Sequence, residues 1–125
     1  MIFDSDVLIW AIRGNEKAAR AITSANDRAL SVVSLMELLQ GARSKLEVRH
    51  IHRSLNSLHF RVLPLSETIG DTAVELIGQY ALSHGLELGD ALIAATAIEA
   101  GVPLYTANVK HFRQIRTLAH IAFRP

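Results

Sequence analysis

The apolar residues of this chain fall into short continuous runs, which alternate with longer stretches where they recur at helical spacing. The short runs predict β-strands at residues 1–3, 29–33, 60–63, 103–106 and 121–123. The longer stretches predict helices at residues 7–12, 16–25, 34–42, 46–58, 69–81 and 90–100. Gly85 and Gly101 follow the last two of these helices, in the position where glycine commonly ends a helix.

Strands that alternate with helices at this pitch form right-handed β-α-β units. We therefore expect an α/β fold in three layers, α/β/α, with a central parallel sheet of four or five strands flanked by helices. The 125 residues contain no linker, repeat or low-complexity tract, which predicts a single domain over residues 1–125. Ligands of such sheets bind at the carboxyl ends of the strands, so polar residues directly after strands are candidates for a site.

The composition narrows the class of protein. Half of the residues are hydrophobic, which is enough for a substantial core. The absence of cysteine excludes a disulfide scaffold, thiol catalysis and a cysteine-bound zinc site. No apolar stretch approaches the ~20 residues of a membrane span, and the N-terminal apolar run has no basic region ahead of it. We expect a soluble, cytoplasmic protein without a signal peptide and without a membrane partner.

The formal net charge of +1 hides a segregation of charge along the chain. Residues 62–101 contain six acids and no lysine or arginine. Residues 43–61 contain five basic residues against Glu47 alone, and the residues after Gly101 carry four basic residues and no acid. This pattern suits a polyanion held against a metal site, although solvent-exposed helix faces produce similar runs.

Three acids stand at the starts of predicted helices, and each has a structural explanation. Asp4 can cap the helix after the first strand, and Asp90 can cap its own helix. Ser34 and Glu37 form the pattern of a capping box. A parallel sheet nevertheless brings at least Asp4 and Glu37 to one edge, where carboxylates repel unless a cation neutralises them. Mg²⁺ and Mn²⁺ prefer such oxygen ligands, and the chemistry that this implies is phosphodiester hydrolysis.

Three longer segments carry these acids: FDSDVLIWAIRG at residues 3–14, SVVSLMELLQGA at 31–42 and LELGDALIAATAIEAGVPLYTANVKHF at 86–112. In this order and at this spacing they resemble the four motifs of PIN domains, and more narrowly those of the VapC toxins of bacterial toxin–antitoxin pairs. The resemblance covers nearly the whole chain and implies a PIN-like fold. It also implies that Asp4, Glu37 and Asp90 are the catalytic acids and the metal ligands.

The resemblance further implies a Mg²⁺- or Mn²⁺-dependent endoribonuclease, a hydrolase of phosphodiester bonds. Its substrate would be single-stranded or structured RNA such as tRNA or rRNA. A cognate VapB-type antitoxin would hold the enzyme inactive, and the chain would form a homodimer.

The chain departs from the family pattern at a fourth acid, which relatives often carry in the segment 106–112. Asn108 or His111 stands there instead, which lowers the negative charge of the site and bears on a second metal ion. Asn108 retains a carbonyl oxygen, and His111 can contact phosphate or transfer a proton. Asp6, Ser5 and Thr106 are the further candidates for side chains that orient the acids.

Basic residues on both sides of the acidic segment are candidates for contacts with RNA phosphates. They are Arg43, Lys45, Arg49, Arg53, Lys110, Arg113 and Arg116. Two alternatives stay open: a phosphatase or phosphotransferase that uses Asp4 and Asp6 as an Asp-x-Asp pair, and a non-catalytic RNA-binding module of PIN-like fold. A phospho-receiver domain fits poorly, because Pro64 follows the third strand where such a domain needs its aspartate.

Overall fold

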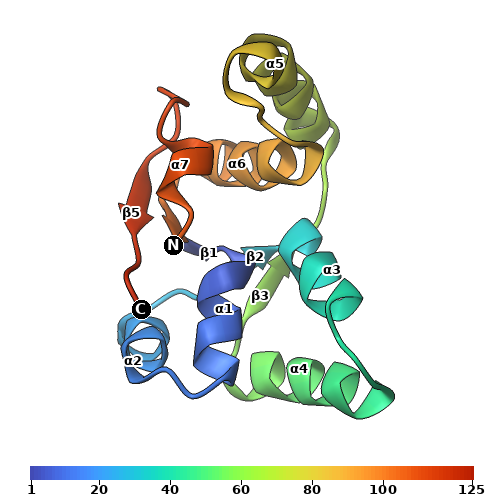
Figure 1. Cartoon of the computed structure of the whole chain (residues 1–125), viewed down its shortest axis with the longest axis vertical. Helices are drawn as coiled ribbons and strands as arrows, with labels where there is room; N and C mark the ends of the chain where they lie inside the picture. The colour runs from blue at the N-terminus through green and yellow to red at the C-terminus, as the bar shows by residue number, and fades with distance from the viewer.

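A parallel β-sheet of five short strands forms the centre of the molecule in the computed structural model, which describes residues 1–125 (Figure 1). The strand order is β3-β2-β1-β4-β5, and every neighbouring pair is parallel. The strands are β1 (Ile2–Phe3), β2 (Ala29–Ser31), β3 (Arg61–Leu63), β4 (Leu104–Thr106) and β5 (His120–Ala122). All five predicted strands are therefore present, within one or two residues of their expected bounds.

Six helices match the helical spacing of the sequence, and a seventh does not. The six are α1 (Ser5–Ile12), α2 (Glu16–Ser24), α3 (Val32–Gln40), α4 (Lys45–Ser57), α5 (Glu67–His84) and α6 (Leu88–Ala100). The helix that was not predicted is α7 (Val109–Phe112), whose four residues are too few to show a period. None of these helices has the combination of length and apolar character that a bilayer crossing requires.

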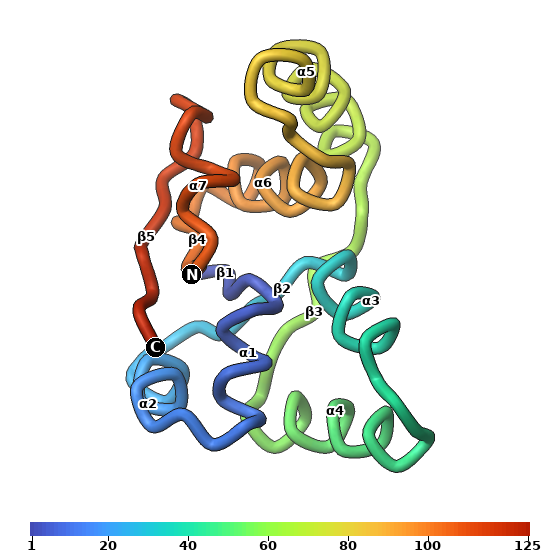
Figure 2. Tube along the Cα trace, viewed as in Figure 1, coloured from blue at the N-terminus to red at the C-terminus, as the bar shows by residue number.

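The side chains of each strand alternate between two hydrophobic clusters, one on each face of the sheet. Ile2 belongs to the cluster built with α5 and α6, whereas its neighbour Phe3 belongs to the cluster with α1, α2 and α4. Ala29 and Leu30 of β2 divide in the same way. Figure 2 shows the result, with α5 and α4 at opposite ends of the molecule and the sheet between them. The expected three-layer α/β/α arrangement is confirmed.

The predicted starts of α1, α3, α5 and α6 are each two residues too late, and the errors at α3 and α6 concern the candidate acids. Helix α3 begins at Val32 because Ser31, at the end of β2, accepts a hydrogen bond from the backbone of Val33, so Ser34 and Glu37 form no capping box. Helix α6 begins at Leu88 with Glu87 at its N-cap, which puts Asp90 inside the first turn. The carboxylates of Glu37 and Asp90 are therefore not used to cap a helix.

Candidate active site at the carboxyl edge of the sheet

Asp4 follows β1 directly and is both a helix cap and the most deeply buried acid of the site. Its Oδ1 accepts a hydrogen bond of 2.8 Å from the backbone N–H of Ser5, which caps α1. Its Oδ2 accepts a bond of 2.8 Å from the hydroxyl of Thr106, at the end of the neighbouring strand β4. The residue is only 5% exposed, and this burial raises the pKa of Asp4 although the hydrogen bonds oppose the rise.

Asp6, in the first turn of α1, ties that helix to the loop after β4. Its Oδ2 accepts a bond of 3.1 Å from the backbone N–H of Ala107, while its Oδ1 is buried and has no hydrogen-bond partner. Burial and then repulsion by Asp4 raise the pKa of Asp6 to about 6. The side chain thus holds the loop at a cost, because its second oxygen is desolvated without compensation.

Thr106 connects these two acids. Its hydroxyl lies 2.8 Å from Asp4 Oδ2 and 3.4 Å from Asp6 Oδ2, and a hydroxyl has one proton to donate. The shorter distance assigns that proton to Asp4. The same oxygen accepts a bond of 3.0 Å from the backbone N–H of Asn108. The side chain of Asn108 itself caps no helix and is exposed.

Glu37 reaches the same place from α3. Its Oε1 accepts a bond of 3.2 Å from the hydroxyl of Ser5. Partial burial raises the pKa of Glu37, and the charges of Asp4 and Asp90 add to the rise. A side chain at Gly89 would begin 3.5 Å from Glu37 Oε2, so the first turn of α6 passes directly against this carboxylate.

Asp90 stands on that first turn and contacts His111, one of the two candidates for the position of the fourth acid. Its Oδ2 lies 3.1 Å from His111 Nδ1. Burial raises the pKa of Asp90, His111 opposes the rise, and the charges of Asp4 and Glu87 add to it. The carboxyl group of Asp90 also raises the pKa of Glu37, so Asp90 interacts electrostatically with both Asp4 and Glu37.

These four acids have no lysine or arginine partner. The ion pairs of lysine or arginine in this chain are Arg20–Glu16 and Arg61–Asp27, and neither involves the site.

As the side chains lie, no three acidic or histidine residues are close enough together to share one metal ion. Side-chain rotation would have to draw the carboxylates together around an ion. The donor set nevertheless suits a divalent cation, because it offers carboxylate oxygens that no lysine or arginine neutralises, including the unpartnered Oδ1 of Asp6.

The arrangement gives no support to the Asp-x-Asp phosphatase alternative. Such an enzyme needs Asp6 free to transfer a proton beside Asp4, whereas Asp6 Oδ2 accepts a hydrogen bond from the backbone N–H of Ala107 and its Oδ1 is buried.

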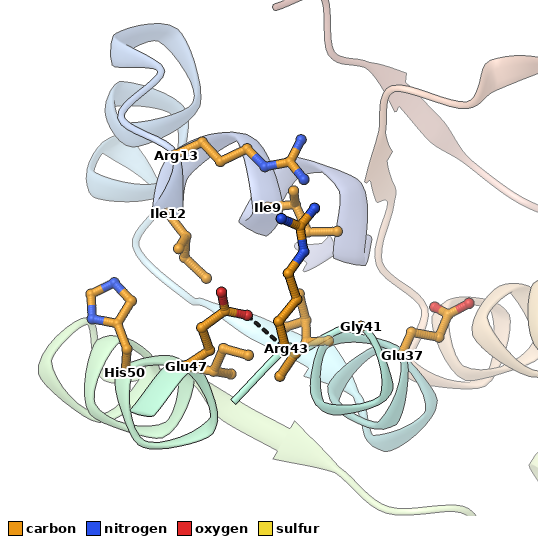
Figure 3. A pocket seen from close by; sticks show the side chains of 11 residues that line it. Ile9, Ile12, Arg13, Glu37, Gly41, Arg43, Glu47 and His50 are labelled. Carbon is orange, nitrogen blue, oxygen red and sulfur yellow. Dashed lines mark hydrogen bonds between the residues drawn. The ribbon is translucent and has the colours of Figure 1, made fainter. Parts of the chain in front are cut away.

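The predicted RNA contacts divide into two groups. Arg43 lines a hollow of about 410 Å³ between α1, α3 and α4, whose wall includes Glu37 (Figure 3). Lys110 lines a second hollow of about 510 Å³ beside β4, β5 and α7, whose wall includes Asn108 and His111. The remaining candidates are exposed and line neither hollow: Lys45, Arg49, Arg53, Arg113 and Arg116.

Sequence reasoning missed two basic residues in these hollows. Arg13, at the end of α1, lines the first hollow, and Arg124, just after β5, lines the second. A usable signal existed for Arg124, since it follows a predicted strand and therefore belongs to the carboxyl edge. For Arg13 the signal was weaker, because it depends on how α4 packs beside α1.

Comparison with known proteins identifies the class. The family model described as PIN domain matches residues 1–118. The chain therefore belongs to the PIN domain family, and PIN-domain ribonucleases depend on a metal ion.

Particular relatives share nearly its full length. It is 42% identical over 122 residues to Ribonuclease VapC10 of Mycobacterium tuberculosis, which covers 94% of this chain and 90% of the relative. A toxin–antitoxin complex from Klebsiella pneumoniae is similar in structure, with a TM-score of 0.78, 28% identity and 94% of each chain covered. VapBC2 from Rickettsia felis, bound to a DNA fragment from its promoter, shares the fold with a TM-score of 0.80 at 22% identity, over 99% of this chain and 100% of that one.

Proposed function

We propose that this chain is a metal-dependent endoribonuclease toxin of the VapC kind, which hydrolyses phosphodiester bonds in single-stranded or structured RNA of the tRNA or rRNA type. The observation that carries the proposal is the gathering of Asp4, Glu37 and Asp90 at one edge of the sheet. Each of these carboxyls has a raised pKa, and none has a lysine or arginine partner. A relative named as a VapC ribonuclease at 42% identity supports it.

The proposed metal ligands are Asp4, Glu37 and Asp90, and the proposed ion is Mg²⁺ or Mn²⁺. The carboxylate donors and their mutual repulsion support this choice, since hard divalent cations take oxygen ligands. When bound, such an ion activates water for attack and stabilises the charge that develops on the phosphate.

The other polar residues have positioning roles in this proposal. Thr106 fixes the orientation of Asp4 through its hydroxyl, and Ser5 does the same for Glu37. Asp6 holds the loop after β4 by its bond to Ala107. His111, whose side chain is 53% exposed, reaches both Asp90 and solvent, so it can donate a hydrogen bond to an incoming phosphate. Asn108 lies in the same loop after β4 and presents a neutral amide, so it adds no negative charge to the site as a fourth acid would.

The proposed partners are the RNA substrate, a VapB-type antitoxin and a second copy of the chain. The antitoxin is supported by the names of structural relatives, which are toxin–antitoxin and VapBC complexes. A homodimer is supported by large apolar side chains that the single chain leaves exposed, among them Met36, Leu82 and Leu88. Because the substrate is cellular RNA, we assign the protein to the cytoplasm, as one PIN domain.

The test is cleavage of labelled tRNA and of a panel of single-stranded RNAs by the purified chain, freed of antitoxin. Reactions with Mg²⁺, with Mn²⁺ and with EDTA are compared for the wild type and for Asp90→Asn. Asp71→Asn is the matched control, because Asp71 is an exposed acid on α5. We expect cleavage that requires a metal ion, disappears in Asp90→Asn and persists in the control. A folded wild type that cuts nothing with either metal ion but still binds RNA would favour the non-catalytic module.

A further inference from the structure

The two hollows lie on either side of the acids, and each contains two cationic side chains. The strand order from one end is β5, β4, β1, β2 and β3. The second hollow is lined by residues directly after β5 and β4, Asp4 follows β1, and Glu37 is on the helix after β2. The first hollow continues beyond Glu37, between α1, α3 and α4. The acids therefore lie between the two hollows, with Glu37 next to the first and the loop after β4 next to the second.

The first hollow is lined by two arginines and two glutamates, and neither arginine forms an ion pair with a carboxylate. Figure 3 shows both side chains reaching over the hollow, Arg13 from the end of α1 and Arg43 from the opposite wall. Glu47 lines the same hollow, but its Oε2 accepts a hydrogen bond of 2.6 Å from the backbone N–H of Arg43 rather than from a guanidinium. Neither arginine takes part in an ion pair. Two unpaired guanidinium groups facing one space are suited to bind phosphate.

The second hollow is basic and, unlike the first, has no acid in its wall. Lys110 and Arg124 line it together with the amide of Asn108 and the imidazole of His111. Lys110 and Arg124 form no ion pair, and His111 contacts Asp90. His111 therefore lies both in the wall of this hollow and beside Asp90, just as Glu37 lies in the wall of the first hollow.

We propose that one RNA strand crosses the acids with its backbone held at both ends, by Arg13 and Arg43 on one side and by Lys110 and Arg124 on the other. This inference rests on the proposed ribonuclease function and deepens it. The carboxylates of the site repel a phosphodiester, so the strand must gain its affinity from cations on either side of the scissile bond. The only phenylalanine, tyrosine or tryptophan in either wall, Phe123, is buried in the core, so phosphates rather than stacked bases provide the contacts.

The test measures binding of a fluorescent single-stranded RNA by anisotropy, with all chains carrying Asp90→Asn so that the RNA stays intact in Mg²⁺. Two double variants remove the cations of one hollow each: Arg13→Gln/Arg43→Gln and Lys110→Gln/Arg124→Gln. The matched control, Lys17→Gln/Arg20→Gln, removes two exposed charges from α2, where neither residue lines a hollow.

We expect each hollow variant to weaken RNA binding at least about tenfold. We also expect the slope of log affinity against log salt to become shallower by about 0.7 for each phosphate that the removed side chains had neutralised. The control should stay within about twofold. Equal weakening in all three double variants would mean diffuse charge attraction and would overturn the proposal, as would weakening confined to one hollow. Unchanged RNA binding combined with weaker antitoxin binding would assign the hollows to the protein partner and also overturn it.

Cleavage by the chain without Asp90→Asn separates this inference from the function on which it rests. A wild type that cuts RNA while the hollow variants bind it normally would contradict the strand path alone. A wild type that fails to cut with either metal ion, while the hollow variants bind RNA more weakly as expected, would contradict the ribonuclease and leave the path supported.

Discussion

Asp27 and the acids of the candidate site show two opposite ways in which this chain holds carboxylates. Asp27 is exposed and accepts two hydrogen bonds from Arg61, at 3.1 and 2.8 Å, and this partner lowers the pKa of Asp27. Asp4, Asp6 and Asp90 are more buried than Asp27, and these three acids and Glu37 have no such partner and have raised pKa values. A carboxylate that serves only to connect β3 with the loop before β2 is neutralised within the chain. The acids of the site are held against their own repulsion, which is typical of a site for an external cation.

The largest expected effect comes from removing one charge of the site while keeping its shape. Asp4→Asn retains an oxygen that can cap α1 but removes the negative charge. We therefore expect kcat for RNA cleavage to fall by more than about a hundredfold. Loss of a residue that only supports a metal ligand usually has a smaller effect, of about 10–100-fold. Asp27→Asn, the matched change outside the site, should leave kcat unaltered. Rates within about twofold of the wild type for Asp4→Asn would contradict its assignment as a metal ligand.

A smaller effect is expected when a supporting hydroxyl is removed. Thr106→Val eliminates the hydrogen bond to Asp4 Oδ2, and we expect Mn²⁺ affinity to fall about 10–100-fold. Thr96→Val is the matched control, because Thr96 is a similarly buried threonine whose hydroxyl donates to Leu92 within α6. If both variants bound Mn²⁺ equally well, Thr106 would have a structural role only.

The smallest effect is on stability, and its sign differs between the two regions. Burial raises the pKa of Asp6 to about 6, so the ionised carboxylate costs stability that increases as the pH rises from about 4 to about 6. Asp6→Asn should therefore raise the Tm at neutral pH, measured with EDTA, and raise it less near pH 4.

The opposite sign is expected at Asp27, whose pKa is lowered in the folded chain. Ionised Asp27 stabilises the fold above the pKa of the unfolded chain, and this stabilisation is lost as the pH falls through the pKa of the folded chain. Asp27→Asn should lower the Tm slightly at neutral pH, and the difference should shrink in acid. Parallel pH profiles for the two variants would contradict this account.

The five strands, six of the seven helices and the sheet edge where the acids meet could be predicted from the sequence. Every strand and six helices follow from hydrophobic spacing, because the sheet must bury alternate residues such as Ile2 and Phe3 on two faces. Helix α7 was missed because its four residues are fixed by tertiary packing of Phe112, which is fully buried, and not by local periodicity.

Two features of the site could not be predicted from the sequence: which serine caps α3, and which side chains far apart in the chain come into contact. Ser31 and Ser34 are equally good caps in sequence, and the end of β2 decides between them; Ser34 is left buried without a hydrogen-bond partner. The bond between Thr106 and Asp4 joins residues 102 positions apart and has no local signal. The shared hollow of Arg13 and Arg43 likewise depends on how α1 and α4 pack.

Titration of Mn²⁺ into the purified chain, with free Mn²⁺ followed by electron paramagnetic resonance, tests the central claim most directly. The comparison includes wild type, Glu37→Gln, Asp90→Asn and Asp27→Asn. We predict that the wild type and Asp27→Asn bind Mn²⁺ with the same affinity, and that Glu37→Gln and Asp90→Asn each bind at least about tenfold more weakly. Equal Mn²⁺ affinity in all four proteins would contradict the claim that these acids form a metal site.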